Sequence, residues 1–257
     1  MSRFRRKKDS KKRRVPLLPN LITTMSLFFG LYSIYYSLNS NFYRAGVFIL
    51  IAAFMDGIDG RVARVTGTTS LFGKEYDSLS DLVAFGVAPA LMVYLWGIHV
   101  YARLGWLTIF LFVACGALRL ARFNTMESST ITFTGLPIPM AAVLLATTIM
   151  LGRVIGPVPP VVILVMVYIL SYMMVSNIMY PSFKHMPYLK AHPFQLLVAG
   201  VLLIMVIAAA PEVMLFILVS IFVAAGPLYE AVRLVKGYKK ERSDGRDEAV
   251  AGEDSNL

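Results

Sequence analysis

Residues 56–81 read DGIDGRVARVTGTTSLFGKEYDSLSD, and they place four aspartates inside a chain that is otherwise strongly apolar. Asp56 and Asp59 are three residues apart, so they share one face of a helix. Asp77 and Asp81 are four apart and share a face in the same way, and a glycine-bearing loop joins the two helical turns. Four convergent carboxylates repel one another unless they are protonated or neutralised by cations. The pattern therefore predicts a metal site.

The rest of the chain has the composition of a membrane protein. Of its 257 residues, 57% are hydrophobic and only 16% are charged, and the mean hydropathy is +0.66. A bilayer core needs about 20 apolar residues per helix. Eight segments fit this length, at residues 19–38, 44–63, 80–99, 104–123, 137–153, 157–179, 193–210 and 212–234. We therefore expect an all-α integral membrane bundle with about eight transmembrane helices.

The distribution of Lys and Arg predicts how this bundle is oriented. With the N-terminus in the cytoplasm and alternating sides, 22 of the 25 Lys and Arg fall on the cytoplasmic side. Arg44, Arg103 and Arg153 fall on the far side. Basic residues collect in cytoplasmic segments of membrane proteins, so both termini are predicted to be cytoplasmic. The expected location is a prokaryotic cytoplasmic membrane, with the aspartates at its cytoplasmic face.

Three regions are expected along the chain: a basic cytoplasmic arm at residues 1–15, a transmembrane catalytic domain at 16–235 and a polar tail at 236–257. The tail lacks an apolar period, which predicts no regular structure there. The net charge of +10 is concentrated in the arm. A basic arm beside a membrane segment indicates contact with anionic membrane lipids. Nucleic acid is not an expected partner, because no aromatic-interleaved basic fold accompanies the arm.

The ligand atoms of the aspartate stretch indicate its chemistry. Oxygen ligands favour Mg²⁺ or Mn²⁺, and all three histidines lie outside the stretch, which disfavours zinc. Four carboxylates can hold two ions, an arrangement that stabilises the attacking and leaving oxygens of phosphoryl transfer. Arg61 and Arg64 offer fork-shaped donors for phosphate. The alternative is that the aspartates cap helices or pair with these arginines. The sequence thus favours a two-metal phosphoryl-transfer site.

The stretch resembles the complete signature of the CDP-alcohol phosphotransferase family, here Asp56-x-x-Asp59-Gly60-x-x-Ala63-Arg64, eight residues, Gly73-x-x-x-Asp77-x-x-x-Asp81. The resemblance implies that Asp56, Asp59 and Asp77 ligate one divalent ion. It implies that Asp56, Asp77 and Asp81 ligate the second, and that Asp81 is the general base for the acceptor hydroxyl.

The same resemblance implies a CDP-linked lipid as donor, CMP as leaving group and a homodimeric enzyme. The nucleotide portion of the donor is expected to be bordered by Gly60, Arg64 and Gly73, with Arg61 and Asn20 as further candidates.

Three further stretches, at residues 117–124, 134–139 and 176–184, resemble the membrane-integral phosphatidylserine synthase branch of the family. This resemblance implies CDP-diacylglycerol as donor and L-serine as acceptor. Arg119 and Arg122 share a helical face, where they could hold a carboxylate or a lipid phosphate; membrane anchoring is the alternative. Asn124, Ser176 and Asn177 are candidate hydrogen-bond partners of the acceptor.

Two other functions would use the same aspartates, namely transfer to another acceptor and cation transport. Glycerol 3-phosphate or an inositol phosphate as acceptor would demand a denser basic pocket than Arg119 and Arg122 supply. A divalent-cation transporter would also use intramembrane carboxylates. Arg61 and Arg64 beside the aspartates would repel the transported cations, which disfavours this alternative.

Overall fold

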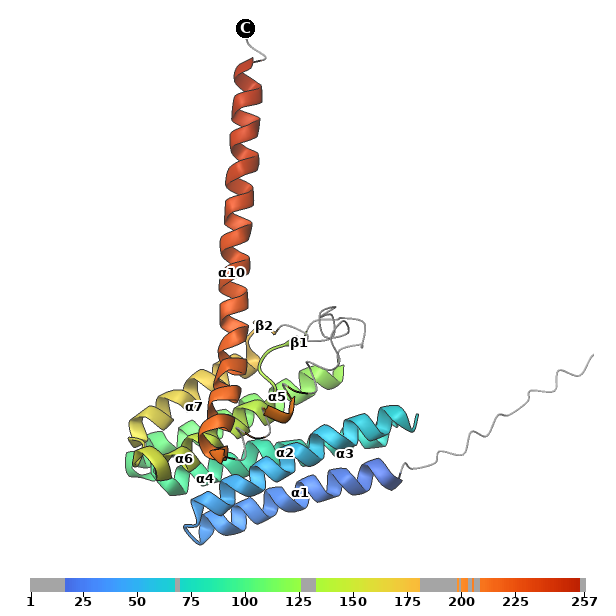
Figure 1. Ribbon diagram of the computed structural model, residues 1–257, viewed down its shortest axis with the longest axis vertical. Helices are drawn as coiled ribbons and strands as arrows, with labels where there is room; N and C mark the ends of the chain where they lie inside the picture. The colour runs from blue at the N-terminus through green and yellow to red at the C-terminus, as the bar shows by residue number, and fades with distance from the viewer. Residues whose placement is uncertain are drawn as a thin grey trace, which may run out of the picture.

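The computed structural model describes residues 17–67, 70–125, 133–180, 198, 200–202, 205 and 209–254. Its helices are α1 (Leu17–Leu38), α2 (Phe42–Val65), α3 (Leu71–Asp81), α4 (Ala88–Trp96), α5 (Ala102–Thr125), α6 (Ile138–Ile155), α7 (Pro160–Val175) and α10 (Pro211–Asp254) (Figure 1). A π-helical turn, Leu82–Val87, joins α3 to α4, and a 3₁₀ turn, Ile98–Tyr101, leads into α5. The strands β1 (Phe133–Thr134) and β2 (Met179–Tyr180) form one short antiparallel pair. The predicted all-α class is confirmed.

The helices have the length and composition of a membrane protein. Within the described residues, five stretches are long and apolar enough to cross a membrane: Leu17–Leu38, Leu71–Trp96, Ile98–Thr125, Ile138–Ile155 and Pro211–Ala231. Helix α2 is also long, at 24 residues, but carries charged residues in its last third. Helix α7 is apolar but only 16 residues long. The predicted span 193–210 and the predicted arm at 1–15 lie mostly or wholly outside the described residues, so the count of eight and the orientation of the termini stay predictions.

The third predicted span begins earlier than expected. The sequence placed its start at residue 80, whereas the helix begins at Leu71. The Ser70 side chain accepts a hydrogen bond from the backbone N–H of Gly73, at 3.0 Å, and so caps a helix that starts before the apolar run. The continuous helical stretch Leu71–Trp96 therefore includes both Asp77 and Asp81.

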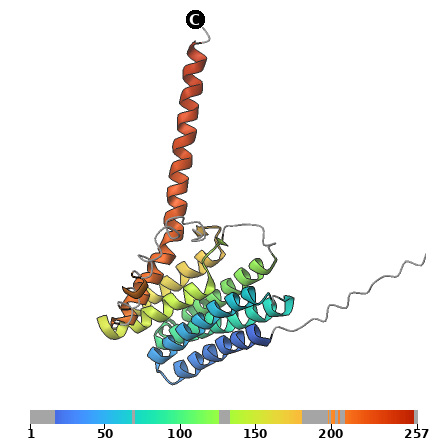
Figure 2. The same cartoon turned by 45° about the vertical axis from the view of Figure 1, so that its right-hand side comes forward.

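The C-terminal region also differs from the prediction. The sequence indicated a tail without regular structure from residue 236, whereas α10 continues as a helix to Asp254. In both views α10 runs far beyond the other helices (Figure 2). Residues 236–254 are rich in Lys, Arg, Glu and Ala, which are strong helix formers even without an apolar face. Periodicity alone does not exclude a helix of this composition.

Helix α1 lies against α2 along a stripe of small and polar residues. The buried positions of α1 are Pro19, Thr23, Ser26, Gly30, Ser33 and Ser37. At Gly30 an added Cβ would lie 2.7 Å from Cα of Ala84, in the π-helical turn. Small residues allow such close approach of membrane helices. The contact holds α1 against the third helix just beyond Asp81.

Helix α6 forms the centre of the core. Every residue from Ala141 to Leu151 is buried, and α6 packs against α2, α4, α7 and α10. At one end of the bundle lie the N-terminus of α1, the end of α2, the start of α3 and the end of α5, on the right in Figure 1. The four aspartates belong to the helices that meet at this end.

Candidate active site

The aspartates of α2 and α3 face each other. Carboxylate oxygens of Asp56, Asp59 and Asp77 all lie within 4.8 Å of one another. Asp81, one turn further along α3, lies beside Asp56. The two same-face pairs predicted from spacing therefore converge on one point.

These carboxylates are partly or fully buried, and none forms an ion pair in the described part of the chain. Asp59 and Asp81 are only 5% and 9% exposed, and Asp56 and Asp77 are half-buried. Oδ1 of Asp77 is buried without a hydrogen-bond partner among the described residues. Within the same part of the chain, no Lys or Arg nitrogen lies within 4.0 Å of any of the four, so pairing with Arg61 or Arg64 is not seen.

This arrangement fits a divalent cation. Buried carboxylates without a basic partner are costly unless a cation neutralises them. Several carboxylate oxygens converging on one point are the ligand set that Mg²⁺ and Mn²⁺ prefer. The unpartnered Oδ1 of Asp77 provides a free ligand atom beside Asp56 and Asp59. The aspartate cluster can therefore hold metal.

A threonine of α1 orients one of these carboxylates. The hydroxyl of Thr23 donates a hydrogen bond to Oδ2 of Asp59 at 2.7 Å, and both side chains are buried. Groups that hydrogen-bond a metal-ligating carboxylate fix its orientation. Helix α1 thus contributes to a site whose four carboxylates come from α2 and α3.

We expect Thr23→Val to weaken binding of Mn²⁺ to the purified protein about tenfold, because outer contacts of this kind contribute 10- to 100-fold to metal affinity. Titration followed by electron paramagnetic resonance of free Mn²⁺ measures the change. The matched control is Thr24→Val, since the Thr24 hydroxyl contacts Tyr76 and a backbone carbonyl rather than a carboxylate. Equal Mn²⁺ affinity in both variants would show that Thr23 does not orient Asp59.

The residues predicted to border a nucleotide lie around the same end of α2 and α3. A Cβ added at Gly57 or Gly60 would meet nothing within 4 Å, so the backbone of α2 is open there. A Cβ at Gly73 would lie 3.3 Å from Oδ1 of Asn20, which places Asn20 of α1 beside the start of α3. Arg61 and Arg64 are exposed, and Nε of Arg64 donates to the carbonyl of Gly60 at 2.8 Å.

The predicted acceptor residues fall into two environments. Arg119 is half-buried, its charge interacts with that of Asp81, and its Nε is buried without a hydrogen-bond partner in the described part of the chain. Arg122 donates to Oδ1 of Asn177 at 2.7 Å and thereby ties the end of α5 to the segment after α7. Within the described residues, Arg119 thus keeps a buried donor without a partner, whereas the guanidinium of Arg122 is bound to Asn177.

Asn124 and Ser176 take part in local contacts. Nδ2 of Asn124 donates to Oγ of Ser78 at 3.0 Å, and Lys74 donates to the Asn124 carbonyl at 3.0 Å. These bonds fasten the end of α5 to α3. The hydroxyl of Ser176 donates to the carbonyl of Met173 at 2.9 Å, within the end of α7.

Comparison with known proteins identifies the family. Residues 16–178 match the family described as CDP-alcohol phosphatidyltransferase, which is well over half of the chain. The chain belongs to this family. The aspartates of α2 and α3 fall inside the matched residues, and so do Arg119 and Arg122 of α5. The resemblance stated from the sequence is confirmed.

Individual members of the CDP-alcohol phosphatidyltransferase family are similar over about two thirds of the chain. A CDP-diacylglycerol–serine O-phosphatidyltransferase of Helicobacter pylori is 44% identical over 173 residues, covering 65% of this chain and 73% of the relative. An enzyme of the same name from Bacillus subtilis is 36% identical over 167 residues, covering 65% and 91%. An archaetidylserine synthase of Methanothermobacter thermautotrophicus is 38% identical over 166 residues, covering 64% and 69%.

Sequence reasoning missed Thr23 and the ties made by Lys74 and Ser78. The only signal for Thr23 was its place on α1, three residues after Asn20 and so on the same polar face. Lys74 and Ser78 contact Asn124 across helices. No spacing within one helix predicts such a contact.

Proposed function

We propose that the protein transfers the phosphatidyl group from CDP-diacylglycerol to the hydroxyl of L-serine, giving phosphatidylserine and CMP. The convergence of Asp56, Asp59 and Asp77 from α2 and α3, with Asp81 one turn further along, in a chain of this family, is the observation that carries the proposal. The names of the Helicobacter pylori and Bacillus subtilis relatives support serine as acceptor. The site acts at the cytoplasmic face of a prokaryotic cytoplasmic membrane, in a homodimer surrounded by membrane lipids.

In this reaction the serine hydroxyl oxygen forms a bond to the lipid-side phosphorus. The bond from that phosphorus to the bridging oxygen breaks, and CMP leaves with the electron pair. The hydroxyl proton passes to a carboxylate oxygen of Asp81. Asp81 suits this role because it lies beside Asp56 and is 9% exposed, so the proton is transferred away from bulk water.

The cofactor is proposed to be two divalent ions, Mg²⁺ or Mn²⁺. Asp56, Asp59 and Asp77 would hold one, and Asp56, Asp77 and Asp81 the other. Bound there, the ions would supply positive charge to the attacking and leaving oxygens. Thr23 keeps the Asp59 carboxylate turned towards its neighbours through the 2.7 Å hydrogen bond.

The nucleotide is proposed to lie over the end of α2 and the start of α3. The open backbone at Gly60 allows close approach, and Gly73 leaves room beside Asn20. Arg61 and Arg64 are exposed on α2, where their guanidinium groups can reach phosphate oxygens. These residues bind and orient the CDP portion while the acyl chains lie among the helices.

The acceptor is proposed to be held by Arg119. In the described part of the chain its Nε is buried without a hydrogen-bond partner, and its charge and that of Asp81 act on each other, which supports a guanidinium donor for the acceptor. Such a donor matches the carboxylate of serine, and it would hold the serine hydroxyl near Asp81. Arg122, Asn124, Ser176 and Asn177 would support this pocket by fixing the ends of α5 and α7.

We expect Arg119→Gln to lower kcat/KM for serine about 10- to 100-fold, mainly through a higher KM for serine, because a charge-assisted hydrogen bond is lost. The KM for CDP-diacylglycerol should change much less. Steady-state kinetics with each substrate varied in turn measures the split. Arg122→Gln is the matched control: its guanidinium already binds Asn177, so we expect a lower unfolding temperature and a smaller rise in serine KM. An unchanged serine KM in Arg119→Gln would exclude Arg119 from acceptor binding.

An acceptor screen tests the proposed function itself. The purified protein in detergent receives labelled CDP-diacylglycerol with Mg²⁺ or Mn²⁺ and one acceptor: serine, glycerol 3-phosphate or inositol phosphate. Labelled phosphatidylserine and equimolar CMP are the expected products. A product with glycerol 3-phosphate but none with serine would overturn the choice of acceptor. A second arm with a CDP-activated archaeal ether lipid tests the donor, because one relative is named archaetidylserine synthase.

A further inference from the structure

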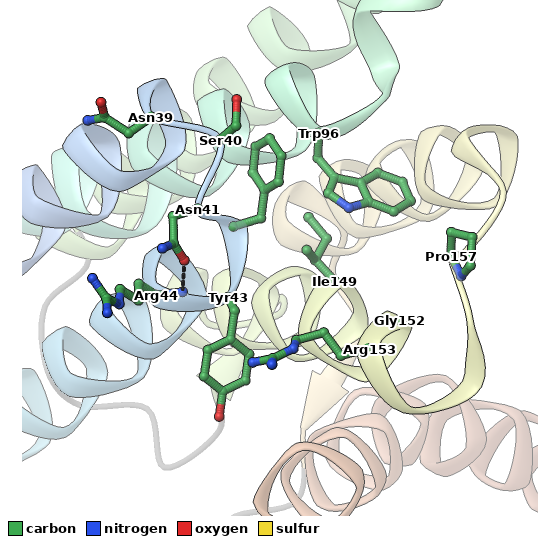
Figure 3. Close-up of a pocket in the computed structure, with 11 residues that line it drawn as sticks. Asn39, Ser40, Asn41, Tyr43, Arg44, Trp96, Ile149, Gly152, Arg153 and Pro157 are labelled. Carbon is green, nitrogen blue, oxygen red and sulfur yellow. Dashed lines mark hydrogen bonds between the residues drawn. The ribbon is translucent and has the colours of Figure 1, made fainter.

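A cavity of about 570 Å³ lies at the end of the bundle opposite the aspartates. The turn between α1 and α2 forms one wall, and the ends of α4 and α6 form the other, as Figure 3 shows. Arg44 lines this cavity and stands 12 residues before Asp56 on α2, which corresponds to roughly 18 Å along the helix. The cavity is therefore separate from the proposed active site.

Two arginines give the cavity its charge. Arg44 comes from the start of α2 and Arg153 from the end of α6, and both are exposed. Cζ of Arg153 lies 4.3 Å from the centre of the Tyr43 ring, and Arg153 points across towards Tyr43 in Figure 3. Cζ of Arg44 lies 5.6 Å from the ring of Tyr36. Among the described residues, neither guanidinium has a carboxylate within 4.0 Å.

Arg44 also occupies an unfavourable place on its helix. It lies in the first turn of α2, a turn without any acidic residue. The N-terminus of a helix carries partial positive charge and favours anions. The Asn41 side chain accepts from the backbone N–H of Arg44 at 3.2 Å and so satisfies only one of the free N–H groups. An anion in the cavity would offset both the helix dipole and the guanidinium.

One carboxylate faces this region from α10. Glu212 accepts a hydrogen bond from the hydroxyl of Tyr43 at 2.9 Å. It offers one negative charge against two guanidinium groups, so the cavity keeps a positive balance. A bound anion is still favoured.

The surroundings indicate which anion would fit. Phe42, Trp96 and Ile149 bring apolar and aromatic surface to the same cavity. Tyrosine and tryptophan at the ends of membrane helices lie at the level of lipid headgroups. Guanidinium groups bind phosphate through paired hydrogen bonds. We propose that this cavity binds the phosphate of a phospholipid headgroup at the membrane face opposite the aspartates.

Photocrosslinking tests this proposal on the full chain in maltoside micelles, which contain no phosphate. The probe is phosphatidylglycerol with a diazirine near the headgroup end of one acyl chain, and a chelator is present to suppress metal-dependent binding at the aspartates. Labelled peptides are expected to contain residues 39–44 or 149–157. The double variant Arg44→Gln/Arg153→Gln should lower their labelling about tenfold. Arg153→Lys keeps the positive charge but loses the paired N–H donors of the guanidinium, so it should lower the labelling less.

The matched control is Arg103→Gln, because Arg103 is predicted to lie on the same side of the membrane but does not line the cavity. It should leave the labelling unchanged. A diacylglycerol probe without phosphate should not label these peptides. Competition by inorganic phosphate at millimolar concentration would assign the site to free phosphate, whereas its failure to compete assigns it to the lipid. Phosphate recognition would be overturned if the double variant were labelled as strongly as the normal protein. It would also be overturned if the neutral probe labelled these peptides as strongly as phosphatidylglycerol does.

Discussion

Asp81→Asn is expected to lower kcat for phosphatidyl transfer about 10³-fold, because the amide keeps the shape of the side chain but cannot accept the proton of the serine hydroxyl. The remaining aspartates Asp56, Asp59 and Asp77 still lie within 4.8 Å of one another, so binding of the CDP-linked lipid should be retained at least in part. Release of CMP from CDP-diacylglycerol and serine measures the rate. Equilibrium binding of a labelled donor measures the affinity.

The control for this substitution is Glu230→Gln, the same chemical change on α10. Glu230 lies 3.9 Å from Arg233 of the same helix and takes no part in the proposed site. Its variant should release CMP at the normal rate. Normal turnover by Asp81→Asn would remove Asp81 as the base, and complete loss of donor binding in that variant would show that its main role is to bind the donor rather than to accept the proton.

Asp77→Asn is expected to weaken Mn²⁺ binding at least tenfold and to abolish transfer at ordinary metal concentrations. The substitution replaces a carboxylate that lies within 4.8 Å of Asp56 and Asp59 and whose Oδ1 has no other partner in the described part of the protein. Electron paramagnetic resonance of free Mn²⁺ measures the binding without any need for turnover. In the normal protein, EDTA should stop CMP release, and added Mg²⁺ or Mn²⁺ should restore it.

Glu75→Gln supplies the control on the same helix. Glu75 is an exposed acid two residues before Asp77, outside the cluster. It should leave Mn²⁺ affinity unchanged, because among the described residues its carboxylate accepts a hydrogen bond from Asn124 alone, at 3.3 Å. Equal Mn²⁺ affinity in the normal protein and in Asp77→Asn would place the metal elsewhere.

The part of the site that lies within single helices could be predicted from the sequence. Asp56 and Asp59 share a face because helical geometry fixes neighbours three apart, and the same holds for Asp77 and Asp81. The apolar runs likewise predicted an all-α membrane bundle. Both inferences use only the spacing of residues within one segment, which can be read directly from the sequence.

The part that lies between helices could not be predicted. The bond from Thr23 to Asp59 and the burial of Nε of Arg119 depend on how α1 and α5 pack against the pair α2 and α3. Arg119 and Arg122 looked equivalent in sequence, yet Arg122 binds Asn177. The early start of α3 depended on a cap at Ser70, which precedes the apolar run that marked the span.

The π-helical turn Leu82–Val87 sets the angular phase between two halves of one membrane helix. An α-helix advances about 100° per residue, whereas a π-turn takes up one extra residue without adding a full step. The extra residue allows the half with Asp77 and Asp81 to face α2 while α4 presents its own apolar side to the core. Because the turn takes up the extra residue, its loss would leave a regular α-helix with the two halves in nearly the same phase, whereas one residue inserted in the flanking α-helical turns would rotate them by about 100°. The turn therefore lets this membrane helix hold one extra residue while the aspartate face stays turned to α2.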